Sequence, residues 1–194
     1  MKQLDLTKSA LIVIDMQRYF LEEGADAYLD PPKSLLPNVI KLIEAFRKMY
    51  RPIVFSRHAH KRTDPPGQMS KWWDNKLPWD DEEQSKLVDE IKPAAGEIFI
   101  TKTRYSLFEG NELDARLKGD GINTTVICGV MTNLCVETTA RHAFMKDLQP
   151  VVVEDACASN SAEFHNAAIT NLKYGFAFIE KTESVLTLLQ SRGK

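Results

Sequence analysis

The stretch Ala10-Leu11-Ile12-Val13-Ile14 is a short apolar run rich in β-branched residues, and five similar runs follow it. They lie at residues 52–55, 97–100, 125–128, 150–153 and 176–179. Continuous apolar character over so few residues is typical of strands buried on both faces of a parallel sheet. Segments whose apolar residues recur at the spacing of a helix separate these runs. The pattern therefore predicts a three-layer α/β/α, doubly wound, Rossmann-like fold with about six mainly parallel strands.

Five segments between and after these strands have the spacing of helices. The first has apolar residues at positions 39, 42, 43 and 46, with Ser34 as its expected N-cap. A second starts at Asn111 and ends near Gly119, and a third starts near Thr132. Ser161 and Ser184 are expected to cap the last two. Because we find no repeat, low-complexity tract or linker, we expect residues 1–194 to form a single domain.

Composition and charge exclude several classes of protein. The 194 residues include 25 Lys and Arg against 27 Asp and Glu, so the chain lacks the basic character of a nucleic-acid-binding protein. Its longest uncharged stretch, residues 121–136, is interrupted by Asn and Thr and falls short of the roughly 18 apolar residues of a membrane span. The N-terminus lacks a signal-peptide pattern. Three cysteines, an odd number, favour reduced thiols, so we expect a cytoplasmic protein with no nucleic-acid or membrane partner.

One long segment, Arg57 to Glu82, interrupts the alternation of strands and helices. It reads RHAHKRTDPPGQMSKWWDNKLPWDDE and holds two of the four histidines and all three tryptophans. Loops of this length inside compact domains are usually functional. We expect it to form a lid or a wall of a substrate pocket. The alternative is a long surface loop whose tryptophans pack against the rest of the domain.

Three reactive side chains are expected where strands end. Asp15 follows the first strand, Lys102 the third and Cys135 the fourth, at the start of a helix. Ligands bind at the carboxyl ends of the strands in open α/β sheets, so these side chains can converge there. A helix N-terminus and a nearby ammonium both favour a thiolate, and a carboxylate can take and return a proton. Each residue alone has an ordinary structural explanation, but the set predicts a nucleophile, an electrostatic stabiliser and a base.

Three longer stretches resemble one known family. ALIVIDMQRYF (10–20), KTRYSLFEGNELDARL (102–117) and CGVMTNLCVETTARHA (128–143) are similar to the isochorismatase-like cysteine hydrolases, which include nicotinamidases and carbamoylsarcosine amidohydrolases. The resemblance continues through VVVEDACAS (151–159) and runs from about residue 8 to residue 190. Several ordered motifs make it far more specific than any single short pattern.

The resemblance implies a role for each reactive residue. Asp15 matches the general base, Lys102 the lysine that stabilises the thiolate, and Cys135 the nucleophile. It also implies a cis peptide bond between Val130 and Met131, with the Met131 and Cys135 backbone N–H groups as an oxyanion hole. The implied reaction is hydrolysis of a C–N bond in a small amide, ureido or carbamoyl compound through a thioester. Relatives commonly form dimers or tetramers, so a homo-oligomer is expected.

The substrate pocket and a metal are further expectations. Phe20 matches an aromatic residue beside the base, and Trp73 is our second candidate for stacking on a planar substrate. Nicotinamidases of the family bind a metal through an Asp-x-His pair and a further His, whereas this chain has His58-Ala59-His60 and no later histidine in the loop. The two imidazoles could bind zinc or iron with help from Asp64 or Asp74; the alternative is a pair of polar loop histidines. The core mechanism requires no cofactor.

Two other functions stay open at this point. A vinyl-ether hydrolase resembling true isochorismatases would use Asp15 as an acid, with Cys135 incidental. Those enzymes lack a cysteine at the nucleophile position, so Cys135 favours cleavage of a C–N bond. A non-catalytic thiol or ligand-binding member of the fold is the other alternative, against which the complete set of three residues argues.

Overall fold

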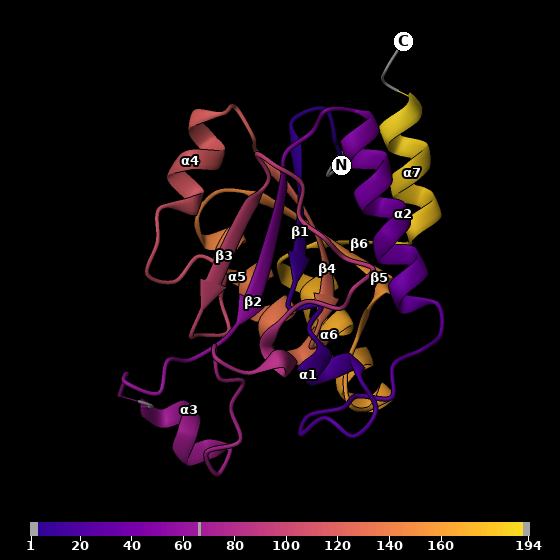
Figure 1. The fold of residues 1–194 in the computed structure, drawn as a ribbon. Coiled ribbons are helices and arrows are strands. Elements are labelled where there is room, and N and C mark those ends of the chain that lie inside the picture. The colour runs from indigo at the N-terminus through magenta and orange to yellow at the C-terminus, as the bar shows by residue number, and fades with distance from the viewer. Residues whose placement is uncertain (1–3, 66, 192–194) are drawn as a thin grey trace.

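In the computed structural model, which describes residues 4–65 and 67–191, six parallel strands form one sheet (Figure 1). They are β1 (Ser9–Ile14), β2 (Ile53–His58), β3 (Ile98–Lys102), β4 (Thr124–Val130), β5 (Gln149–Ala158) and β6 (Phe178–Glu180). Their order across the sheet is β3-β2-β1-β4-β5-β6. The chain moves outward from β1 to β3 and then returns to β4 on the other side of β1. This reversal creates a topological switch point between β1 and β4, where open sheets of this kind bind ligands.

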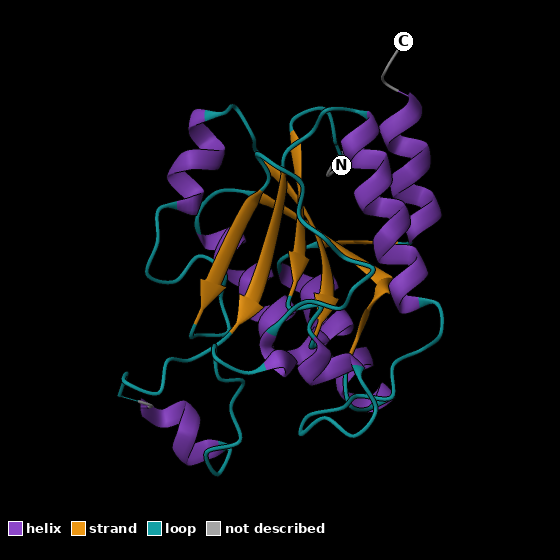
Figure 2. Cartoon of the chain, in the orientation of Figure 1, coloured by secondary structure: helices purple, strands orange, loops and turns teal. Residues whose placement is uncertain are grey.

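Helices cover both faces of the sheet (Figure 2). On one face, α2 (Leu35–Lys48) packs beside α7 (Thr182–Ser191). The other face carries α4 (Leu113–Gly119), α5 (Glu137–Met145) and α6 (Ala162–Gly175). The remaining short helices are α1 (Arg18–Leu21), α3 (Gly67–Trp72), the 3-10 helix η1 (Glu83–Ser85) and the π-helix η2 (Thr132–Val136). The expected three-layer arrangement is confirmed.

Burial on both faces explains the uninterrupted apolar sequence of the central strands. Leu11 and Val13 of β1 pack into the core under α2 and α7, whereas Ala10, Ile12 and Ile14 pack into the core under α4, α5 and α6. Full burial of each large apolar side chain contributes about 1.5–3 kcal/mol. The edge strands differ from this pattern: β3 and β6 are only partly buried, because each has a neighbour on one side alone. Within the described part of the chain, no helix has the length and apolar character to cross a membrane.

The helix starts agree with the sequence only in part. Ser34 lies at the N-cap of α2 but makes no side-chain capping bond, and Glu112 rather than Asn111 is at the N-cap of α4. Ser161 caps α6 by accepting a hydrogen bond from the Phe164 N–H at 3.2 Å, and Asn111 accepts one from the Leu113 N–H at 3.0 Å. The expected cap at Ser184 is wrong, because α7 already begins at Thr182. The N–H and the hydroxyl of Thr182 both donate to Oδ1 of Asp155, each at 2.8 Å. A partner from β5 therefore satisfies this helix end, and local sequence does not reveal it.

Gly129 allows β1 and β4 to approach closely at their carboxyl ends. It pairs with Ile14 in the sheet and has φ +114°, a conformation that side chains with a Cβ rarely adopt. A Cβ at this position would overlap the carbonyl oxygen of Ile14. The close approach brings Asp15, directly after β1, toward the segment that follows β4.

Candidate active site

The structure brings the three expected reactive residues together at the switch point. Asp15 directly follows β1, Cys135 lies in η2 after β4, and Lys102 is the last residue of β3 rather than the first one beyond it. Asp15 is fully buried, and Lys102 and Cys135 are each 4% exposed. These side chains come from three separate segments, and the parallel strand ends are what bring them together.

Lys102 contacts both of the other reactive groups. Its Nζ lies 2.6 Å from Oδ2 of Asp15 and 3.2 Å from Sγ of Cys135. It also donates to the carbonyl oxygen of Arg104 at 3.1 Å. Among the described residues, Oδ2 of Asp15 makes no hydrogen bond beyond its ion pair with Lys102. We expect that oxygen to accept the proton of the thiol, a role that stays a prediction.

Two buried polar residues that the sequence did not single out hold this arrangement in place. Ser56 of β2 donates to Oδ1 of Asp15 at 2.7 Å and accepts from the Asp15 N–H at 3.2 Å. Asp15 has φ +48°, so these two bonds fix a backbone conformation that is uncommon for a residue with a side chain. Gln17 bonds to both backbone groups of His58, which ties the ends of β1 and β2 together. The sequence offered only weak evidence for these two roles. Ser56 is a serine at the end of an apolar run, and Gln17 is a glutamine two residues after the expected base.

Burial sets the resting protonation state of the thiol. It raises the pKa of Cys135 to about 12; Lys102 opposes this increase, and Asp15 adds to it. Burial by itself lowers the pKa of Lys102, but Asp15 and Cys135 outweigh it and the pKa is raised. Lys102 lowers the thiol pKa, as the sequence led us to expect, but burial is the larger effect. The carboxylate offsets part of the charge of the ammonium, so we expect Cys135 to rest as a neutral thiol in the free protein.

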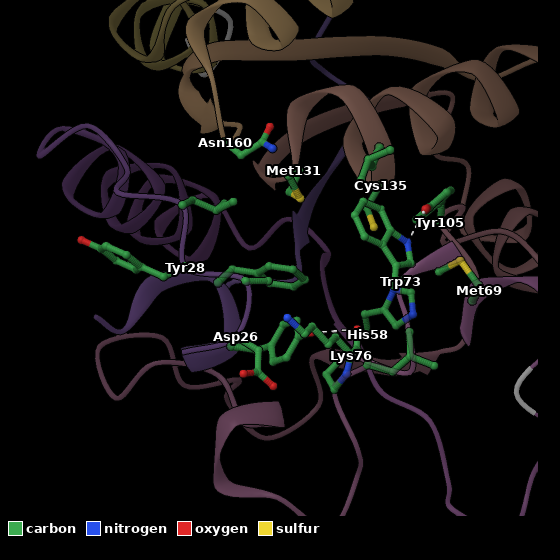
Figure 3. Close-up of a pocket in the computed structure, with 17 residues that line it drawn as sticks. Asp26, Tyr28, His58, Met69, Trp73, Lys76, Tyr105, Met131, Cys135 and Asn160 are labelled. Carbon is green, nitrogen blue, oxygen red and sulfur yellow. Dashed lines mark hydrogen bonds between the residues drawn. The ribbon is translucent and has the colours of Figure 1, made fainter. Parts of the chain in front are cut away.

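A cavity of about 330 Å³ opens above Cys135. Phe20 and Trp73 line it, and the Trp73 Nε1–H donates to the Tyr105 hydroxyl at 3.0 Å (Figure 3). The segment from Arg57 to Glu82 contributes Trp73 and also Met69, so it forms a wall of this cavity. That the substrate binds against this wall stays a prediction. A cavity of this size suits a small molecule. Aromatic walls around it favour a planar ligand.

The Val130–Met131 peptide bond is cis, as the resemblance implies. Met131 is buried at the start of η2 and, like Cys135, lines the cavity. The two residues of the expected oxyanion hole therefore line the same cavity. Donation by these two N–H groups to a substrate stays a prediction.

The donor set for a metal is incomplete. Asp15, His58 and Cys135 each offer a ligand atom within 4.8 Å of the others, and no other cluster of this kind occurs among residues 4–65 and 67–191. Lys102 pairs with the Asp15 carboxylate and donates to Sγ of Cys135, so an ammonium already occupies the position beside both of these ligand atoms. His60 is not a member of the trio, and neither Asp64 nor Asp74 joins it. These residues do not fit the zinc or iron site that His58 and His60 suggested in the sequence.

The raised thiol pKa predicts how alkylation of Cys135 depends on pH. Below the pKa the thiolate fraction grows about tenfold per pH unit, so the rate with iodoacetamide should rise without a plateau between about pH 7 and pH 9. Peptide mapping by mass spectrometry measures this rate at each cysteine. Cys128 and Cys157 are internal controls: burial raises the pKa of both thiols, and they should stay unmodified in the folded protein. A plateau near neutral pH would contradict a protonated resting thiol.

Known proteins match this chain over most of its length. The isochorismatase domain model matches residues 9–184. Nicotinamidase 3 from Arabidopsis thaliana is 34% identical over 173 residues, covering 88% of this chain and 83% of the relative. Ureidoacrylate amidohydrolase RutB from Yersinia enterocolitica is 31% identical over 205 residues, covering 91% of this chain and 86% of the relative.

Solved structures share the fold. A cysteine hydrolase from Pseudomonas syringae pv. phaseolicola 1448A has a TM-score of 0.91 at 22% identity, over 97% of this chain and 95% of that one. A pyrazinamidase of Pyrococcus horikoshii, solved in complex with zinc, has a TM-score of 0.76 at 26% identity, over 90% of this chain and 99% of that one. The domain match and the two sequence relatives together assign the chain to a family: it belongs to the isochorismatase family.

Proposed function

We propose that this protein is a cysteine-dependent hydrolase that cleaves a C–N bond in a small amide or in a ureido or carbamoyl compound. The main support is the buried contact of Lys102 with both Asp15, at 2.6 Å, and Sγ of Cys135, at 3.2 Å. This geometry joins a base, a cation and a nucleophile at the edge of a cavity. Two relatives are named for nicotinamide and ureidoacrylate, which supports an amide or ureido group as the target.

The first half of the reaction forms a thioester. As Sγ of Cys135 attacks the substrate carbonyl carbon, the thiol proton moves to Asp15 and the carbonyl π electrons move to oxygen. The Met131 and Cys135 N–H groups stabilise the resulting oxyanion. When the intermediate collapses, the C–N bond breaks and Asp15 returns the proton to the leaving nitrogen. Lys102 pairs with Asp15 at the start and balances the developing negative charge on sulfur.

The second half of the reaction releases the acid. Water attacks the thioester carbonyl while Asp15 takes one of its protons. Collapse of this second tetrahedral intermediate breaks the C–S bond, and the proton on Asp15 returns to sulfur, which restores the neutral thiol. Every proton is handled by Asp15, so the core mechanism requires no cofactor.

Phe20 and Trp73 are the proposed substrate-binding side chains. Both line the cavity, and the bond between Trp73 and Tyr105 holds the indole at its wall. We assign the activity to residues 1–194 as a single domain, because all six strands join one sheet in the described part of the chain. Three free cysteines are consistent with a cytoplasmic enzyme. A homo-oligomer, a dimer or tetramer, is part of the same proposal and rests on the family resemblance.

Substitution of Cys135 tests the proposed chemistry. Cys135→Ala should lower kcat by at least about a thousandfold, because members of a catalytic unit act together. The measurement is ammonia release from nicotinamide, pyrazinamide and a series of ureido and carbamoyl compounds. This variant leaves the Asp15–Lys102 ion pair intact, whereas loss of either charged partner would leave a buried charge that costs about 3–5 kcal/mol of stability.

The matched control is Cys157→Ala, which removes a buried thiol that does not line the cavity. It should keep near wild-type kcat. Retained ammonia release in Cys135→Ala would overturn the proposed function. Activity that is insensitive to alkylation of Cys135 would favour vinyl-ether chemistry at Asp15 instead.

Two adjacent tryptophans test the proposed pocket wall. Trp73 lines the cavity, whereas its neighbour Trp72 does not and is 77% exposed. Trp73→Ala should raise KM roughly tenfold, the effect of about 1.4 kcal/mol of lost stacking, and Trp72→Ala should leave KM unchanged. Steady-state kinetics on one accepted substrate measure both variants. Equal effects of the two substitutions would exclude a specific role for Trp73.

A further inference from the structure

Two imidazoles beside the reactive thiol bond directly to each other. Nε2 of His58 lies 2.9 Å from Nε2 of His60, and each residue is only 3% exposed. Two unprotonated nitrogens at this distance would repel each other, and two N–H groups would clash. One proton must therefore lie between them, so one ring donates and the other accepts.

The surrounding protein fixes both rings through their backbone. The His58 N–H donates to Oε1 of Gln17 at 2.7 Å, and Nε2 of Gln17 donates to the His58 carbonyl oxygen at 2.9 Å. On the other side, the His60 N–H donates to the Pro78 carbonyl oxygen at 2.9 Å, and the His60 carbonyl oxygen accepts from the Asp80 N–H at 2.9 Å. The backbone positions of the pair are therefore built into the fold and do not depend on a metal for their assembly.

Burial and nearby positive charge both act on the two rings. Burial and the nearby Lys102 lower the pKa of His58 well below its ordinary value. Burial and Arg104 lower the pKa of His60, although Asp64 acts in the opposite direction. Desolvation is the larger cause for both rings, and it favours the neutral form in which one ring can donate a proton to the other.

His58 is the member of the pair that reaches the reaction site. It lines the cavity, and one of its ring nitrogens lies within 4.8 Å of both a carboxylate oxygen of Asp15 and Sγ of Cys135. Figure 3 shows His58 below Trp73. His60 does not line the cavity, so it can act on the substrate only through His58.

We infer that His58 and His60 form a metal-free, proton-sharing pair in which His60 fixes the tautomer and ring orientation of His58, and that His58 contacts the substrate beside Cys135. His60 is thus a positioning residue. The kinetic part of this inference rests on the proposed function; the metal and spectroscopic parts do not.

Metal uptake is the first test. The full chain is incubated with one equivalent of Zn²⁺ or Fe²⁺, separated from free ion, and analysed by elemental mass spectrometry. We expect no stoichiometric uptake of either metal. If some metal does bind, the bound amount should be the same in His58→Ala and His60→Ala, which would place the metal at another site. Stoichiometric uptake that either substitution abolishes would overturn the inference. His142→Gln is the matched control, because this histidine bonds to Ser106 away from the cavity.

The proton between the rings is visible by ¹⁵N NMR of the imidazoles. We expect two neutral rings, one protonated at Nε2 and the other at Nδ1, in the wild-type protein at neutral pH. His142 and His165 provide the reference signals, since each bonds through Nδ1 to a hydroxyl. Two rings with the same tautomer, or an imidazolium in the pair, would contradict the inference. This measurement needs no variant and no substrate.

Kinetics test the positioning role. His60→Phe removes the partner of His58 and should raise KM about tenfold, the typical effect of one lost hydrogen bond, with a smaller change in kcat. His60→Gln, which can still bond to His58, should restore KM toward the wild-type value. Equal KM values for the two variants at equal thermal stability would exclude the positioning role. Loss of activity in Cys135→Ala tests the proposed function separately.

Discussion

The buried ion pair between Asp15 and Lys102 is the interaction on which the site depends. Two charges 2.6 Å apart are almost fully removed from water. Desolvation of such a pair costs several kcal/mol per ion, so the pair persists only where other groups satisfy it. Ser56 on one carboxylate oxygen, the Arg104 carbonyl on the ammonium and the sulfur of Cys135 provide these contacts. Stability alone does not account for so costly an arrangement, whereas the proposed catalytic role does.

The same pair determines how the thiol reacts. A lysine without a carboxylate beside it would favour a thiolate, but Asp15 offsets that charge and burial keeps the proton on sulfur. In the proposed mechanism the nucleophile therefore forms only as it attacks, with Asp15 as the acceptor of its proton. Such a thiol is protected from nonspecific oxidation and alkylation, because the thiolate is the reactive form.

Much of the fold and part of the site could be predicted from the sequence. Apolar runs located all six strands, and strand ends located Asp15, Lys102 and Cys135, because parallel strands present their carboxyl ends at one edge. The sequence did not predict three contacts: those of Ser56 and Gln17 at the site, and the bond of Asp155 to the start of α7. Each contact joins residues that lie at least 27 positions apart in the chain. The thiol pKa was also missed: it reflects the depth of burial and the balance of two opposite charges, which no local motif encodes.

The central claim is that reaction passes through an acyl group on Cys135. Partitioning with hydroxylamine tests this most directly, using an amide and an ester of the same acid as alternative substrates. A common thioester predicts the same ratio of hydroxamate to free acid from both substrates at each hydroxylamine concentration, because the leaving group has already departed. A ratio that depends on the leaving group, or free acid alone at every concentration, would contradict the account.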